Sequence, residues 1–246
     1  GLSKKWMIEA VDNSLKRLGT DYLDIYYMHH VDWDTPLEES VAAMGEIIAS
    51  GKAKYWGFSN HRAWQIGELA HLCDRLGCPR PIIAQPLYNI VNRQVEADLL
   101  PACEYYGIGV SPYSALARGV LTGKYKLGKD APSNSRAGRG DASILSRDFQ
   151  KESFQVVEKI KKYLGKRDMT PSDFAVNWLL NNQLVTSVIG GPRTLAQWKS
   201  SVNAIKHDFT AEDEAFVNSL VPAGHPATPG HTWGRYPVKG RRAING

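Results

Sequence analysis

The sequence predicts an α/β fold in which parallel strands alternate with helices. Short apolar runs, each long enough for one buried strand, alternate with longer segments of helical periodicity. The first four runs follow one another at intervals of roughly 26–30 residues, the length of one strand–helix unit. Polar side chains follow the carboxyl end of each run, where parallel α/β sheets carry their binding sites. We expect a single domain over residues 1–246, a length that provides a substantial core.

Five segments have the composition of buried, parallel strands. They cover residues 22–28, 53–58, 81–84, 108–112 and 184–189. A closed parallel barrel needs eight strands, so five would form only part of one. An open doubly wound sheet is the alternative, but the chain has neither a Gly-x-Gly-x-x-Gly after a strand nor a Walker phosphate loop.

Helix signals separate these strands. Ser3 can cap a first helix whose apolar positions share one face. Thr35 to Glu38 has the pattern of a capping box, with proline at the first helical position. Residues 63–76 and 94–106 are predicted as the next two helices. Two further helices are predicted to begin at the capping boxes that follow Thr170 and Thr210.

Two segments lack periodicity. The stretch from Gly119 to about Leu145 is rich in glycine, proline and serine, which is typical of a lid or a mobile loop. Residues 222–246 contain four prolines, including Pro237, and are predicted to form an irregular C-terminal tail.

Bulk composition predicts a soluble cytoplasmic protein. No stretch approaches the roughly 20 apolar residues of a membrane span. The three cysteines are odd in number and lack zinc spacing, which favours a reducing compartment and no metal site. The net charge is +5, and the clearest basic run, Lys159 to Arg167, lies at a predicted helix end. Cations are favourable there, so we expect no nucleic-acid partner.

The polar residues at the strand ends are the candidates for chemistry. His29 follows the first strand, Ser59 and Asn60 the second, Gln85 the third and Tyr113 the fourth. Each also has a structural interpretation. A histidine at a strand end is commonly a packed residue, Ser59 and Asn60 could cap the next helix, and Tyr113 could pack in the core. Gln85 ends an apolar strand and needs a polar partner.

Three segments resemble the aldo-keto reductases. They are Ser14–His29, Gly51–Asn60 and Pro112–Tyr125, and they are most similar to the branch of potassium-channel β-subunits and bacterial relatives. The resemblance extends from Gly1 to about Val221. It implies a (β/α)8 barrel that binds NADP(H) in extended form and reduces aldehydes and ketones to alcohols.

The resemblance also explains the strand count. Gly1 matches the helix after the third strand of the family barrel, so the first strands, with the family's catalytic tyrosine, aspartate and lysine, precede the matched region. Only the catalytic histidine is matched, by His29. We expect either a fragment of a reductase or a short form with another role.

By the same resemblance, the nicotinamide carboxamide is held by Ser59, Asn60 and Gln85, and Tyr113 stacks on the ring. The turn over the pyrophosphate is matched by Ser114, Leu116 and Arg118. Lid residues are matched by Lys124 and Arg136, and the adenosine end by Gly191, Arg193 and Gln197. Arg193 favours NADPH because a guanidinium can bind a 2′-phosphate with two hydrogen bonds. Trp33 is a candidate for the substrate pocket, and His30, which should face away from His29, is expected to be structural.

The function implied is an NADPH-dependent oxidoreductase acting on a small carbonyl compound. The alternative is an NADP(H)-binding regulatory or non-catalytic protein like the channel β-subunits. Exposed strand edges in an incomplete barrel leave homo-oligomerisation open.

Overall fold

The computed structural model describes residues 1–140 and 147–231. The end of the predicted lid and Pro237 lie outside these ranges. Four parallel strands form one sheet in the order β1-β2-β3-β4. They are β1 (Leu23–Met28), β2 (Ala53–Ser59), β3 (Ile83–Gln85) and β4 (Gly109–Val110). The register pairs Leu23 with Ala53, and it pairs Ile83 with both Gly57 and Gly109.

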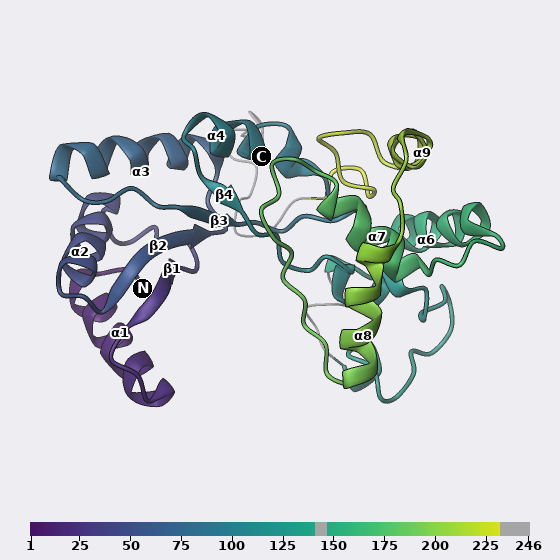
Figure 1. Cartoon of the computed structure of the whole chain (residues 1–246), viewed down its shortest axis with the longest axis horizontal. Coiled ribbons are helices and arrows are strands. Elements are labelled where there is room, and N and C mark those ends of the chain that lie inside the picture. The colour runs from purple at the N-terminus through teal and green to yellow at the C-terminus, as the bar shows by residue number, and fades with distance from the viewer. Residues whose placement is uncertain (141–146, 232–246) are drawn as a thin grey trace, which may run out of the picture.

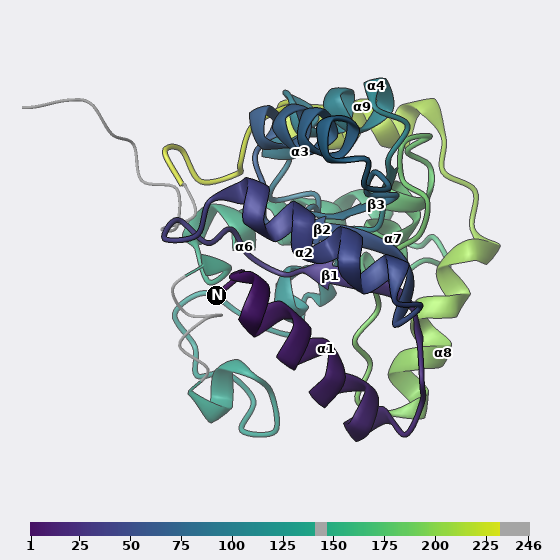
Figure 2. The same ribbon diagram turned by 90° about the vertical axis from the view of Figure 1, so that its left-hand side faces the viewer.

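Helices cover one face of this sheet. They are α1 (Lys4–Leu18), α2 (Leu37–Ala49), α3 (Ala63–Leu76) and α4 (Leu99–Tyr105). Each packs against the next, as the helices of a barrel do, and α1 to α3 lie side by side in Figure 2. The interface between these helices and the sheet is filled by fully buried side chains, among them Met28, Met44, Trp56, Phe58 and Ile66. The α/β fold with a parallel sheet is therefore confirmed.

A second group of helices follows β4 and lies beyond the carboxyl ends of the strands (Figure 1). It contains α6 (Lys151–Leu164), α7 (Pro171–Leu180), α8 (Leu195–Asn203) and α9 (Ala211–Leu220), and the short 3₁₀ helices η2 (Ala117–Thr122), η3 (Ala137–Arg139) and η4 (Ala204–Lys206). The predicted capping boxes of α7 and α9 are confirmed. In each, the threonine hydroxyl accepts from the backbone of an aspartate that bonds back to the threonine N–H.

The predicted fifth strand, 184–189, is wrong for the part of the chain that the structure describes. The segment runs beside β4 as an extended chain, and Thr186 N donates to Val110 O over 2.8 Å. In return, Val110 N donates to the side-chain Oγ1 of Thr186 over 3.1 Å, in place of a backbone carbonyl. A side-chain acceptor satisfies the donor of β4 but does not continue a backbone ladder.

Two helix starts also differ from the prediction. α2 begins at Leu37 without a side-chain cap, because the Thr35 hydroxyl donates to Asp32 Oδ2 at 2.8 Å instead. The predicted helix over 94–106 is divided into the 3₁₀ turn η1 (Gln94–Glu96) and α4. Pro101 explains the division, because it has no N–H and its ring clashes with the carbonyl four residues earlier.

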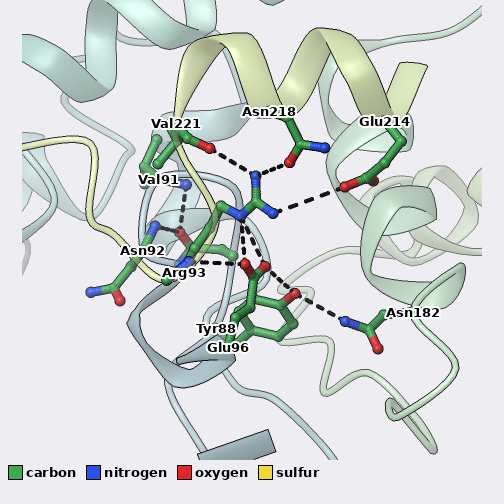
Figure 3. Close-up of polar contacts among 11 residues, drawn as sticks. Tyr88, Val91, Asn92, Arg93, Glu96, Asn182, Glu214, Asn218 and Val221 are labelled. Atoms are coloured by element: carbon green, nitrogen blue, oxygen red, sulfur yellow. Dashed lines mark hydrogen bonds and ion pairs between the residues drawn. The ribbon is translucent and has the colours of Figure 1, made fainter. Parts of the chain in front are cut away.

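Arg93 connects the loop after β3 to α9, as Figure 3 shows. Its side chain is almost fully buried and paired with Glu96 at 2.9 Å. The guanidinium also donates to Asn218 Oδ1 and to Val221 O, each over 2.7 Å. The Tyr88 hydroxyl donates to the Glu96 carboxylate at 2.6 Å. A buried ion pair is favourable only when its remaining donors and acceptors are satisfied, as they are here. The network therefore holds α9 against the loop that follows β3.

The tail is described only as far as His231. Residues 222–231 contain no helix and no strand, and Asn92 and Pro226 form an isolated bridge that holds the segment against the loop after β3.

Candidate functional site

The carboxyl ends of the four strands open into one cavity of about 310 Å³, which we name the tip cavity. His29 and His30 follow β1, Asn60 follows β2, Gln85 ends β3 and Tyr113 follows β4. Its lining comprises His29, His30, Asn60, Gln85, Tyr113, Arg118 and Arg147. Five predicted site residues therefore lie in one cavity, as parallel strand–helix units require.

Asn60 holds the strand ends together. Its Nδ2 lies 2.9 Å from the backbone oxygen of His29, 2.9 Å from Ser59 Oγ and 2.9 Å from His30 Nδ1. Its Oδ1 accepts from the Tyr113 hydroxyl at 2.9 Å. The amide thus connects the tips of β1, β2 and β4.

The backbone at these tips is unusual. Among the described residues, the non-glycine positions with positive φ are Asn60 at 59°, Ser114 at 59°, Ala117 at 44° and Arg118 at 50°. Asn60 directly follows β2, Ser114 lies in the loop after β4, and Ala117 and Arg118 begin η2. The left-handed region is unfavourable for residues other than glycine and asparagine, and such strain is concentrated at functional sites in proteins.

His30 does not face away from His29, so the predicted orientation of its side chain is wrong. The two imidazoles stack with centroids 4.3 Å apart and an interplanar angle of 14°. β1 ends at Met28, so the alternation of side chains along a strand no longer applies to the two histidines. An amide nitrogen only donates, so its contact with His30 Nδ1 is a hydrogen bond in the tautomer that carries the ring proton on Nε2.

Ser59 is a buried residue that supports the lining of the tip cavity. It is 2% exposed, and its hydroxyl donates to the backbone oxygen of Gln85 at 2.6 Å. The side chain of Gln85 remains in the cavity beside Tyr27. Burial raises the pKa of the Tyr27 phenol, and its hydrogen bond with Gln85 opposes this. The polar partner expected for Gln85 is therefore present.

The turn after β4 contains a buried ion pair. Arg118 lines the tip cavity and is paired with Asp148, whose side chain is 8% exposed. Burial raises the pKa of the Asp148 carboxyl, and the charge of Arg118 opposes this. Ser114 accepts at its backbone oxygen from Asn89 Nδ2 over 3.0 Å, and Leu116 packs against the core. The ion pair, the hydrogen bond from Asn89 and the packing of Leu116 thus hold the turn after β4 in place.

Several predicted residues do not line the tip cavity. Lys124 is exposed, with its ammonium 5.0 Å from the centre of the Tyr125 ring, and Arg136 is exposed on the loop that contains η3. Trp33, in the loop after β1, is 62% exposed.

Gly191, Arg193 and Gln197 lie together at the start of α8. Gln197 Oε1 accepts from the backbone N–H of Arg193 at 2.7 Å, and Thr194 caps the helix by accepting from Gln197 N. The Arg193 guanidinium donates to the backbone oxygen of Asn134 at 3.4 Å, which brings the loop before η3 to this helix. A helix N-terminus with an arginine is a suitable environment for a phosphate group.

Sequence reasoning missed Arg147, which lines the tip cavity, and Asp148, which forms the ion pair with Arg118. They follow the long glycine-rich loop, and no local pattern marks them. Among the described residues, no cluster of histidine, cysteine and carboxylate side chains could hold a metal ion, and no helix is long and apolar enough to span a bilayer.

Parallel strand–helix units define an α/β protein, and the polar cavity at their carboxyl ends lies in the position where barrel enzymes carry their ligand sites. The model of the aldo/keto reductase family matches residues 1–221. The chain belongs to the aldo/keto reductase family.

Individual relatives agree with this assignment. The chain is 39% identical over 207 residues to a probable voltage-gated potassium channel subunit beta of Arabidopsis thaliana, covering 83% of this chain and 63% of the relative. It is 31% identical to an L-glyceraldehyde 3-phosphate reductase of Escherichia coli O157:H7, with 91% and 65% covered. It is 32% identical to a versiconal hemiacetal acetate reductase of Aspergillus parasiticus, with 92% and 65% covered. The chain thus spans less than two thirds of the length of these relatives.

Proposed function

We propose that the protein binds NADP(H) across the strand tips and takes part in hydride transfer to a small aldehyde or ketone. The observation that carries the proposal is the convergence of His29, Asn60, Gln85 and Tyr113 from four successive strands on one cavity. A phenol ring, two amides and an imidazole suit a flat ring that bears a carboxamide, since the carboxamide both donates and accepts.

Each side chain then has a distinct role in the proposal. Tyr113 offers a ring face for stacking, and its hydroxyl fixes Asn60. Asn60 and Gln85 orient the carboxamide, while Ser59 holds Gln85 and Asn60 rather than the ligand. When bound, NADPH supplies the hydride. His29 orients the substrate carbonyl and stabilises the negative charge that develops on its oxygen.

The phosphate-bearing part of the cofactor is proposed to extend from the tip cavity to α8. Arg118, in the turn with Ser114 and Leu116, is placed for the pyrophosphate. Lys124 and Arg136 belong to the loop that would cover it. Gly191, Arg193 and Gln197 would hold the adenosine end, and the positive charge of Arg193 at a helix N-terminus is the reason to propose NADPH over NADH. Trp33 remains a proposed contact for the substrate.

A second function is a cofactor-binding subunit with little or no turnover. The 39% identity to a probable potassium channel subunit beta favours it. Three free cysteines, two of them buried, support a cytoplasmic location for either function. The exposed apolar side chains of α8, Leu195 and Trp198 among them, support association of identical chains.

Two measurements on the same preparation separate these functions. NADPH fluorescence titration reports binding, and oxidation of NADPH in the presence of 4-nitrobenzaldehyde reports turnover. Binding with turnover supports the reductase, binding without turnover supports the regulatory subunit, and the absence of saturable NADPH binding contradicts both.

A further inference from the structure

The two stacked histidines at the tip of β1 differ in how they are held. Both imidazoles line the tip cavity. They follow the end of β1 at Met28, and the backbone bends at His30. His29 is exposed, whereas His30 is half-buried. His29 is thus the more accessible ring of the pair.

The ring of His29 is oriented by stacking. The hydrogen bond that reaches His29 comes from Asn60 Nδ2 and ends at the backbone oxygen, so it does not constrain the ring. The torsion that turns an imidazole about its Cβ–Cγ bond has broad minima, and a contact is needed to fix the plane of the ring. Among the described residues, His30 supplies this contact, with centroids 4.3 Å apart and planes inclined by 14°.

His30 is held in turn by the amide of Asn60. Nδ2 of Asn60 lies 2.9 Å from Nδ1 of His30, and Oδ1 accepts from the Tyr113 hydroxyl at 2.9 Å. The hydroxyl fixes which end of the amide carries the N–H groups. These two N–H groups serve three acceptors, the other two being His29 O and Ser59 Oγ. A continuous set of contacts therefore leads from Tyr113 through Asn60 to the two imidazoles.

We propose that His30 is a positioning residue, which sets the plane of the His29 imidazole so that His29 presents a fixed edge to a carbonyl oxygen in the tip cavity. This inference rests on the proposed function, which gives His29 that carbonyl. A group stabilises developing charge best when it is held in the required orientation before the reaction. Stacking restricts the rotation of the ring through its face and occupies neither of its nitrogen atoms.

Two variants of His30 separate the ring from the hydrogen-bond acceptor. His30→Phe keeps an aromatic ring against His29 and removes the acceptor that Asn60 faces, whereas His30→Asn removes the ring and keeps an acceptor. The rate kcat is measured with 4-nitrobenzaldehyde at saturating NADPH. It should fall about threefold to tenfold in His30→Asn, as for the loss of one aromatic pair, and by less than about twofold in His30→Phe. His71→Ala, which removes an exposed imidazole from α3, is the control and should leave kcat unchanged.

NMR of the cofactor-free protein gives a second readout, which does not depend on turnover. The stack places His29 in the ring current of His30, so the ring protons of His29 should shift in His30→Asn and remain displaced in His30→Phe. NOE contacts between the two imidazoles are expected in the unmodified chain. If His30→Asn does not fold, these contacts and the kcat of His30→Phe still decide the question.

The proposal is overturned by an unchanged kcat in His30→Asn, by equal losses of kcat in the two variants, or by the absence of NOE contacts between the rings. These outcomes leave the proposed function intact as long as the unmodified chain turns over. A chain that binds NADPH without turnover contradicts the reductase function itself, and the role of His30 is then rejected with it.

Discussion

The hydroxyl of Tyr113 donates to Oδ1 of Asn60 over 2.9 Å, and this bond joins two strands that are not neighbours. Tyr113 follows β4 and Asn60 follows β2, and β3 lies between them in the sheet. The bond therefore crosses the tip of β3, where Gln85 lies. It holds the aromatic ring and the Asn60 amide in a fixed relation before any ligand arrives, which reduces the entropy lost on binding.

Tyr113→Phe keeps the ring and removes the bond to Asn60. We expect NADPH to bind about fivefold more weakly, corresponding to one hydrogen bond of about 1 kcal/mol. Tyr113→Ala should cost considerably more because the stacking surface is lost. Fluorescence titration measures both. Tyr105→Phe, at a position 83% exposed, is the matched control and should not change the affinity.

His30→Phe tests the second histidine of the cavity. Phenylalanine can still stack on His29, but it offers no acceptor to Asn60. The affinity for NADPH should fall by roughly threefold to tenfold, as for loss of one hydrogen bond. His30→Ala should cost more, since the stack is lost as well. Affinities that are unchanged in both variants would show that His30 has no part in the site.

Arg193→Ala tests the adenosine end. We expect NADPH binding to weaken by about 1.5–3 kcal/mol, the value for a hydrogen bond to a charged group, and NADH binding far less. Lys199→Ala, which removes an exposed cation from the same helix, is the control. Equal losses for the two cofactors would refute a 2′-phosphate contact.

Arg93→Met tests the buried network. The substitution leaves Glu96 buried without its partner, and we expect the free energy of unfolding to fall by about 3–5 kcal/mol. The double variant Arg93→Met with Glu96→Gln should recover part of this loss, because no charge remains unpaired. Urea unfolding at pH 7 measures both. A double variant that is less stable than Arg93→Met would contradict this explanation.

Stability should decrease in weak acid because of His61. Burial lowers its pKa to about 4 in the folded protein, so the unfolded chain, with an ordinary value near 6.5, binds the proton first. The stabilisation is complete above pH 6.5 and is lost as the pH falls from 6.5 to 4, by up to about 3 kcal/mol. Urea unfolding between these pH values should show a smaller slope for His61→Asn. The same slope in both proteins would show that His61 titrates normally.

Much of this fold could be predicted from the sequence because local patterns determine it. The strands ending at Met28, Ser59 and Gln85 and the helix over 63–76 follow from apolar runs with clear stop signals. Their parallel arrangement then places His29, Asn60, Gln85 and Tyr113 at one edge, so the tip cavity follows from topology alone.

The errors arise where long-range contacts override local signals. The segment 184–189 has the composition of a strand, but the Thr186 hydroxyl takes the place of a backbone acceptor. Thr35 has the position of a helix cap, but Asp32 binds its hydroxyl. His30 lies just beyond the end of β1, and Arg147 lies far along the chain from the strands, so no periodicity predicts that either residue lines the cavity.

A crystal structure of the protein with NADP⁺ tests the central claim most directly. The account predicts the nicotinamide ring against the face of Tyr113, with its carboxamide within hydrogen-bonding distance of Asn60 and Gln85 and the adenosine phosphate at Arg193. A nicotinamide bound away from the strand tips, with these side chains free of contact, would contradict it.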